Sequence, residues 1–148
     1  MDFEAMRAGL EQAVPFNQHL GLEVVELGIG RAVVRLPDDA GLRNHVGSQN
    51  ASALFAAGQA AAGAALAATF VEHLEAVEPL ADGAEITYKK IPRATITATA
   101  VLPTTPAELL EELERDGEAR FAIGVGLTDG AGDVVADMTS RWLVRRES

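Results

Sequence analysis

The segment at residues 51–69 constrains the fold of this 148-residue chain more than any other part of the sequence. Eleven of the eighteen residues from 51 to 68 are alanine, the residue with the highest helix propensity. Ser48 or Asn50 is placed to act as the N-cap. At ~1.5 Å per residue, such a helix would be roughly 28 Å long, about the width of a small domain. Because the segment is apolar on most faces, the rest of the chain must cover most of its surface.

Strand patterns make up much of the remaining sequence. Residues 22–36 contain two β-rich runs on either side of Gly28 and Gly30, which predicts a hairpin. The runs at 119–128 and 133–144 are joined by Asp-Gly-Ala-Gly, a sequence typical of hairpin turns. Two further strands are predicted at 85–91 and 94–102, on either side of a Pro-Arg pair.

Helical patterns accompany these strands. Residues 2–14 place four apolar side chains at spacings of three and four, one stripe of a short amphipathic helix, which Pro15 is expected to end. Residues 15–22 are predicted to be a loop leading into the first strand. Residues 106–115 are predicted to be a short acidic helix with Pro106 in its first turn. The apolar stripe of the first helix consists of Phe3, Met6, Leu10 and Val14.

The order of these elements predicts the fold class. A helix, two strands, one long helix and about four more strands indicate an α+β protein in which an antiparallel sheet wraps around one long central helix. No repeat or linker divides the sequence, so we expect a single domain over residues 1–148. One short sheet on one helix leaves an edge strand and an apolar face open, and pairing two copies edge to edge would cover both. We therefore expect a homodimer, or a dimer of such dimers.

Composition argues against several classes of function. The chain has 12 Lys and Arg against 22 Asp and Glu, a net charge of −10, which opposes binding to nucleic acid or to an anionic membrane. It has no cysteine, so it has no disulfide, thiolate metal site or cysteine nucleophile. The N-terminus lacks the basic start and apolar run of a signal peptide, and the alanine-rich segment is too weakly hydrophobic for a good membrane span. We expect a cytoplasmic protein.

Residues 44–63, NHVGSQNASALFAAGQAAAG, resemble the signature of the hotdog-fold acyl-CoA thioesterases, and most closely their phenylacetate-pathway (PaaI-like) branch. The upstream sequence PFNQHLGLEVVELGIGRAVVRLP resembles the opening hairpin of that family, and YKKIPRA at 88–94 resembles the strand and turn after its helix. The resemblance extends from about Pro15 to Arg145. It implies a hotdog fold, a site at the seam between two subunits, and hydrolysis of an acyl-CoA thioester without a cofactor beyond the coenzyme A part of the substrate.

The resemblance also implies roles for residues around the start of the central helix. The family's turn histidine falls on Asn50, its two glycines on Ala51 and Ser52, its phenylalanine on Phe55 and its acidic residue on Gln59. Glutamine orients water or substrate by hydrogen bonds but does not accept a proton at neutral pH. The expected chemistry is attack by water on the thioester carbonyl, with helix-start amides on the oxyanion and Gln59 with Asn50 positioning water or substrate. The structural alternatives are a simple helix cap at Asn50 and a glutamine hydrogen-bonded across the dimer seam.

Other polar residues are weaker candidates. His45, in the loop before the helix, is a candidate substitute base or an ordinary surface histidine. Lys89, Lys90 and Arg93 form a compact basic cluster in an acidic chain, either to bind the phosphates of coenzyme A or as a solvated group. No two histidines have metal-ligand spacing, so no metal site is expected. Glu72 and Asp137 are candidates for a recruited carboxylate that no pattern singles out, and Trp142 and Phe121 are interpreted as core residues.

Three functions remain open on these grounds. Acyl-CoA thioester hydrolysis is the leading hypothesis. A non-catalytic acyl-CoA or acyl-ligand binding protein on the same fold is the second, and Gln59 in place of an acid favours it directly. A dehydratase or hydratase ranks last, because that chemistry usually needs a His–Asp or His–Glu pair that the helix start lacks apart from His45. The acidic charge would repel an acidic carrier protein, so coenzyme A is the expected carrier.

Overall fold

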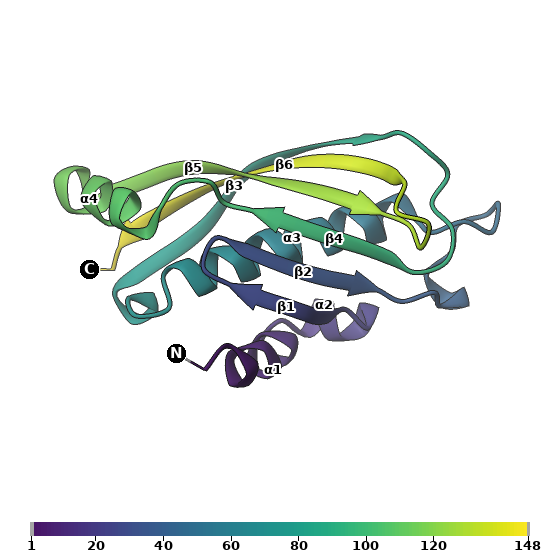
Figure 1. Ribbon diagram of the computed structural model, residues 1–148, viewed down its shortest axis with the longest axis horizontal. Helices are drawn as coiled ribbons and strands as arrows, with labels where there is room; N and C mark the ends of the chain where they lie inside the picture. The colour runs from purple at the N-terminus through teal and green to yellow at the C-terminus, as the bar shows by residue number, and fades with distance from the viewer. Residues whose placement is uncertain (1, 148) are drawn as a thin grey trace.

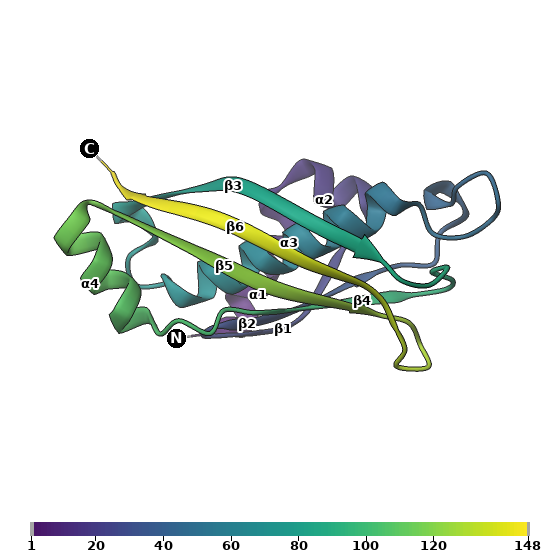
Figure 2. The ribbon, with the colours of Figure 1, turned by 90° about the horizontal axis from the view of Figure 1, so that it is seen from above.

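Six antiparallel strands form one sheet that curves around the α3 helix, Ala51–Thr69 (Figure 1). This computed structural model describes residues 2–147. The strand order is β1-β2-β4-β5-β6-β3, and the view from above in Figure 2 shows the strands lying over the helix. The predicted α+β architecture is therefore confirmed. The other elements are α1 (Phe3–Ala13), α2 (Pro15–Leu20), β1 (Glu23–Gly28), β2 (Arg31–Leu36), η1 (Ala40–Leu42), η2 (Leu74–Ala76), β3 (Val77–Tyr88), β4 (Ile96–Val101), α4 (Pro106–Asp116), β5 (Glu118–Thr128) and β6 (Val134–Arg146).

The α3 helix has the bounds that the sequence predicts. Asn50 is its N-cap, and the Asn50 side chain accepts a hydrogen bond from the backbone N–H of Ser52 at 2.8 Å. Ala57, Ala61 and Ala65 have no exposed surface, because the sheet lies directly against them. By length and composition α3 could cross a membrane, but 61% of its apolar window is buried inside the molecule, as in the core helix of a globular fold.

The two predicted hairpins are confirmed, whereas the strand after α3 is longer than predicted. β1 pairs with β2 and β5 with β6, both antiparallel. β3 begins at Val77, eight residues before the predicted start at residue 85, and pairs with β6 along its whole length. The sequence hides this strand because Pro79, Asp82 and Gly83 are all disfavoured in strands. They are tolerated here because β3 is an edge strand with a register shift between Ala81 and Gly83.

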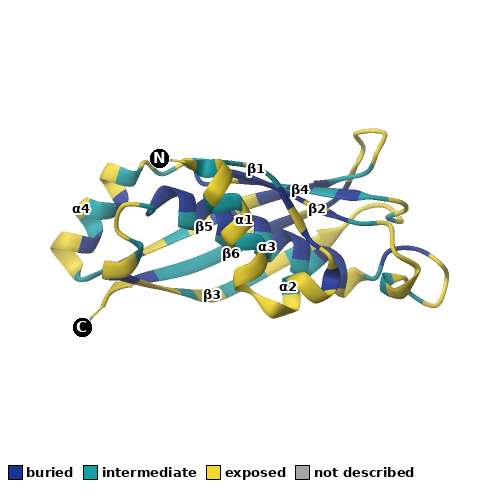
Figure 3. Ribbon diagram, turned by 90° about the horizontal axis from the view of Figure 1, so that it is seen from below, coloured by how far each residue is buried: buried dark blue, intermediate teal, exposed yellow. Residues whose placement is uncertain are grey.

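The segment 15–22 is not the predicted loop. Pro15 does end α1, but it also occupies the first turn of α2, where its missing N–H costs nothing. Gly21 then ends α2 in the left-handed conformation, with φ of 71°. Figure 3 shows α1 and α2 lying on the side of α3 that faces away from the sheet. The N-terminal helices therefore form a partial roof over a helix that the sheet covers only on its other side.

The two edge strands of the sheet, β1 and β3, have different neighbours. At the β1 edge, Arg7 Nη1 of α1 donates to the carbonyl of Val25 at 3.0 Å, and Glu11 Oε1 accepts from the N–H of Val24 at 2.8 Å. These side chains occupy backbone groups that an edge strand otherwise leaves open. At the other edge, β3 has β6 on one side and no strand of residues 2–147 on the other.

Close contact between α3 and β6 depends on a glycine. A Cβ atom added at Gly58 would collide with Sδ of Met138 on β6. Five residues further along, a Cβ at Gly63 would lie 3.7 Å from the ring of Trp142, an ordinary contact. Replacing each glycine in turn by alanine therefore separates two effects. Both substitutions raise helix propensity, but the added methyl group collides with a neighbour at Gly58 and not at Gly63.

We expect Gly58→Ala to lower the free energy of unfolding by about 1–3 kcal/mol, the usual cost of overpacking a core. Gly63→Ala is the matched control, and it should leave stability unchanged or raise it by about 1 kcal/mol through helix propensity. Urea unfolding of both variants beside the wild type measures the difference. Equal midpoints for the two variants would show that Met138 moves aside at no cost.

Candidate active site

A cavity of about 330 Å³ lies between α3 and the N-terminal helices. Its walls come from α1, α2, β1, β2, α3, η2, β3 and β6, and most of the lining side chains are apolar. Three polar residues interrupt this lining: Glu11 from α1, Asn17 from α2 and Gln59 from α3. A large apolar cavity with a few convergent polar groups is the usual form of a small-molecule site.

The side chain of Gln59 is held by a chain of hydrogen bonds from β6. Nε1 of Trp142 donates to Oγ of Ser140 at 2.7 Å, and the Ser140 hydroxyl donates to Oε1 of Gln59. Ser140 is fully buried, so water does not compete for these bonds. The carbonyl oxygen of Gln59 is therefore occupied, and its amide N–H groups, which have no partner within residues 2–147, are the donors it offers to the cavity.

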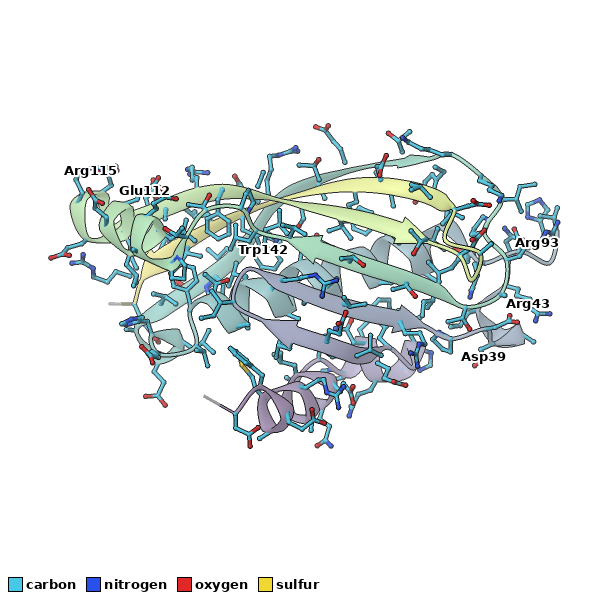
Figure 4. The ribbon with its side chains drawn as sticks, in the orientation of Figure 1. Asp39, Arg43, Arg93, Glu112, Arg115 and Trp142 are labelled. Atoms are coloured by element: carbon cyan, nitrogen blue, oxygen red, sulfur yellow. The ribbon has the colours of Figure 1, made fainter. Side chains whose placement is uncertain are left out.

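Trp142 has a second function besides packing. The sequence suggests a core residue, and the indole is indeed packed against the hydrophobic core. It also lines the cavity, where its N–H fixes Ser140 and hence Gln59. Figure 4 shows Trp142 in the middle of the molecule, away from both ends of the sheet.

The start of α3 offers fewer free amides than the resemblance implies. The N–H of Ser52 is taken by the Asn50 side chain, and the N–H groups of Ala53 and Leu54 donate to the Asn50 carbonyl at 3.0 and 3.2 Å. Within the part of the chain that the structure describes, the N–H of Ala51 remains without a partner. Tyr88, at the end of β3, donates its hydroxyl to the Ala51 carbonyl at 3.1 Å, and burial raises the pKa of that phenol. A single backbone donor is thus left at this point.

Asn50 and Gln59 do not line the same cavity. Nine residues of helix separate them, or roughly 13 Å along the axis. Asn50 and Ser52 line a shallower hollow of about 320 Å³ together with His19 and Arg43. A single protomer therefore does not place both side chains on one reacting group.

The remaining residues at the helix start are dispersed. Ala51 lines a third hollow, of about 450 Å³, with Tyr88, Lys89 and Lys90. Phe55 is half-buried and packs against the hydrophobic core. His45 is exposed on its loop and lines none of these three spaces, so its candidacy as a base gains no geometric support.

The basic cluster is partly neutralised by acidic neighbours. Nζ of Lys89 lies 2.5 Å from Asp137, and Nζ of Lys90 lies 2.6 Å from Asp133. The hydrogen bond to Asp133 raises the pKa of the Lys90 ammonium above its ordinary value. Asp137, a candidate carboxylate from the sequence, is thus engaged on the surface. Arg93, in contrast, forms no ion pair with any residue from 2 to 147.

Arg93 is held beside the start of α3 by backbone contacts. The N–H of Gln49 donates to the carbonyl of Pro92 at 2.9 Å, and the buried Gln49 side chain donates to the carbonyl of Ala94 at 2.9 Å. Ala94 has a positive φ of 60°, a strained conformation for alanine that these contacts maintain. Figure 4 shows Arg93 and Arg43 at the same end of the molecule.

Glu11 is the functional candidate that the sequence alone does not single out. Of residues 2–147, it is the one carboxylate that lines the cavity. The available signal is its spacing, because Arg7 and Glu11 fall at helical intervals on the half-buried face of α1, beside Leu10. A charged residue on an apolar stripe needs a partner, and both Arg7 and Glu11 find theirs on β1. The described residues bring together no group of three His, Asp or Glu that could hold a metal ion.

Three comparisons with known proteins bear on the family. The model of the family described as "Domain of unknown function (DUF4442)" matches residues 3–144. The comparison with curated proteins gave no match.

Solved structures share the fold over nearly the whole chain. A Pseudomonas aeruginosa protein of unknown function, described as a probable thioesterase, is 27% identical, with a TM-score of 0.89 over 99% of this chain and 97% of its own. The Escherichia coli PaaI protein from the phenylacetic acid degradation operon is 18% identical, with a TM-score of 0.73 over 97% and 92%. A mutant thioesterase from Staphylococcus aureus is 13% identical, with a TM-score of 0.74 over 89% and 99%. The chain therefore belongs to the DUF4442 family, and its fold is the hotdog fold of thioesterases.

Proposed function

We propose that this protein hydrolyses acyl-CoA thioesters, with the acyl group in the cavity between α1 and α3. The observation that carries the proposal is the fixed amide of Gln59, which lines a mostly apolar cavity with N–H groups that have no partner within residues 2–147, at the helix position to which the resemblance assigns an acidic residue. An apolar cavity suits an acyl chain, and a fixed hydrogen-bond donor suits the carbonyl oxygen at the end of that chain.

Gln59 is suited to bind the oxygen on which charge develops. As water adds to the thioester carbonyl carbon, the carbonyl oxygen becomes negative, and a donor that is already oriented stabilises it without reorganising. The carbon–sulfur bond then breaks, the acyl group leaves as a carboxylic acid and the sulfur of coenzyme A takes a proton. Ser140 and Trp142 act as positioning residues, because they fix which end of the Gln59 amide faces the cavity.

The polar part of coenzyme A would lie at the start of α3. The guanidinium of Arg93, which has no ion-pair partner within residues 2–147, lies there, and its planar donors suit a phosphate. The ammonium groups of Lys89 and Lys90 contribute less to phosphate binding than their number suggests, because carboxylates already accompany both.

The open edge of β3 is the proposed contact between two copies of the chain. An unpaired edge strand is a template for pairing, and a two-fold axis across β3 would extend the sheet through both subunits. Such an axis reverses the direction of α3 in the second copy. The start of one helix then lies nearer the interior of the other, which offers a way for Asn50 and Gln59 to serve one substrate.

Non-catalytic binding of an acyl-CoA is the second candidate function. The observation that favours it is the absence of any acidic residue in α3, ASALFAAGQAAAGAALAAT, although this helix lines the cavity. Binding needs only the cavity and the donors, whereas hydrolysis also needs a group that accepts a proton from water.

We expect turnover of an acyl-CoA panel, followed as release of free thiol, to depend on Gln59. Gln59→Ala should lower kcat by about 10²–10³-fold, as does the loss of one donor to an oxyanion. Ser140→Ala should lower kcat less and leave KM nearly unchanged, because the amide remains but is no longer held.

The matched control for these variants is Ala60→Ser, which adds one hydroxyl to the same cavity wall and should keep most of the activity. Acyl-CoA binding measured by calorimetry without thiol release from the wild type would instead favour the binding protein.

We expect Arg93→Gln to weaken the binding of free coenzyme A by about two- to fivefold, the effect of losing one exposed ionic contact. Arg115→Gln changes the net charge equally at the opposite end of the molecule, on α4 (Figure 4), and should leave affinity unchanged. Calorimetry at low and physiological salt tests both, and the loss should shrink as salt rises. Equal effects of the two variants would show that only net charge matters.

We expect two inactive variants to complement each other if the site is shared between subunits. Asn50→Ser keeps a capping oxygen for α3 but removes the amide donors, and Gln59→Ala removes the other group. Mixing the two with subunit exchange should restore about a quarter of wild-type activity, because half of the dimers are mixed and each mixed dimer has one intact site. A monomer in gel filtration, or no gain on mixing, would contradict the shared site.

A further inference from the structure

We propose that Glu11 is the general base of this site, an inference that rests on the proposed hydrolysis. Within residues 2–147 it is the one carboxylate lining the cavity that Gln59 also lines. It comes from α1, across the cavity from the central helix, where Figure 3 shows α1 over α3. The proton acceptor that α3 lacks is thus present on the opposite wall.

The hydrogen bond to β1 orients the Glu11 carboxylate. Oε1 accepts from the N–H of Val24 at 2.8 Å, so the side chain is tied at one oxygen. A carboxylate has two oxygens with about four lone-pair sites, and one backbone N–H occupies only one of them. Glu11 is half-buried and lines the cavity, so the tie leaves acceptor capacity for a water molecule there.

Glu11 on α1 and Gln59 on α3 have different roles in the proposed reaction. A water molecule adds to the thioester carbonyl carbon and gives one proton to Glu11, while the Gln59 amide donates to the carbonyl oxygen as it becomes negative. When the carbon–sulfur bond breaks, the protonated Glu11 returns that proton to the sulfur of coenzyme A. Atoms and charge balance: water and thioester become carboxylic acid and thiol, and Glu11 is again a carboxylate. Asn17, also on the cavity wall, is a further polar group within the same space.

Glu11→Gln separates this role from a structural one. The glutamine retains an oxygen that accepts from the N–H of Val24, so the tie between α1 and β1 is preserved, but it does not accept a proton from water. We expect kcat to fall by about 10²–10⁴-fold, the usual contribution of a general base, with KM within about threefold of the wild type and an unchanged melting temperature.

Arg7→Gln is the matched control. Arg7 makes the neighbouring tie of α1 to β1, through its guanidinium and the carbonyl of Val25, and it does not line the cavity. If α1 only needs to be anchored, both variants should lose activity alike. If Glu11 is the base, Arg7→Gln should retain wild-type kcat whatever its effect on the melting temperature.

The double variant Glu11→Gln with Gln59→Glu tests whether the two side chains serve one reacting carbonyl. It moves the carboxylate back to α3 and places an amide on α1, and we expect at least a tenfold gain in kcat over Glu11→Gln alone. No gain would overturn the placement of both groups on one carbonyl. Wild-type kcat in Glu11→Gln would overturn the role of Glu11 and leave the proposed hydrolysis standing. Absence of turnover in the wild type, with acyl-CoA bound, would overturn both.

Discussion

The close packing of α3, a helix built mainly from alanine and glycine, against a curved sheet is the constraint on which the rest of the structure depends. Alanine and glycine let β2, β4, β5 and β6 approach α3 closely, and at Gly58 even one methyl group is too large for the contact with Met138. Small side chains also supply little bulk on the uncovered side of the helix. The space left there, between α3 and the roof formed by α1 and α2, is the cavity. The small side chains of α3 thus account both for its close packing against the sheet and for the cavity on its other side.

A single amide, Gln59, is the polar side chain that α3 contributes to the cavity. A buried polar group without a hydrogen bond is costly, so the fully buried Ser140 donates to the half-buried Gln59 and accepts from Trp142. The bonds that satisfy the carbonyl oxygen leave the N–H groups toward the cavity. The side chain therefore offers hydrogen-bond donors at the position to which the resemblance assigns a carboxylate. Hydrolysis then needs a proton acceptor from another element, and α1 brings Glu11 to the same space.

Local patterns predict most of the fold, and the predictions fail where pairing is non-local. The bounds of α3 follow from alanine content and the Asn50 cap, both of which act within one segment. The start of β3 is missed because its strand-disfavoured residues, among them Pro79, are held by register with β6 more than fifty residues away. The helix α2 is missed because a proline after a helical pattern indicates the end of a helix, whereas Pro15 also occupies the first turn of the next one.

The candidate site is also predictable from the sequence where the information is local, and not where it depends on contacts between distant residues. Gln59 and the helix start are visible in the sequence because the resemblance is carried by one continuous segment. The partners that define their chemistry lie elsewhere: Ser140 is 81 residues from Gln59 in the chain, and Glu11 lies on a helix ahead of the resembling sequence. The basic cluster in the sequence does not reveal the acidic neighbours of Lys89 and Lys90, which the fold brings alongside them. Side-chain type is local information, whereas what a side chain contacts is not.

The negative charge of the chain determines where affinity for an anionic substrate must come from. At physiological ionic strength the Debye length is about 8 Å, so acidic residues at the far end of the molecule have little effect at the start of α3, and Arg93 acts locally. One unpaired guanidinium supplies only a small part of the binding free energy. The apolar cavity would supply more to an acyl chain bound there, because each buried methylene contributes about 0.8 kcal/mol. Under the proposed hydrolysis, a site built this way would select its substrate by the acyl group, and it would hold free coenzyme A weakly enough to release it once the thioester is cleaved.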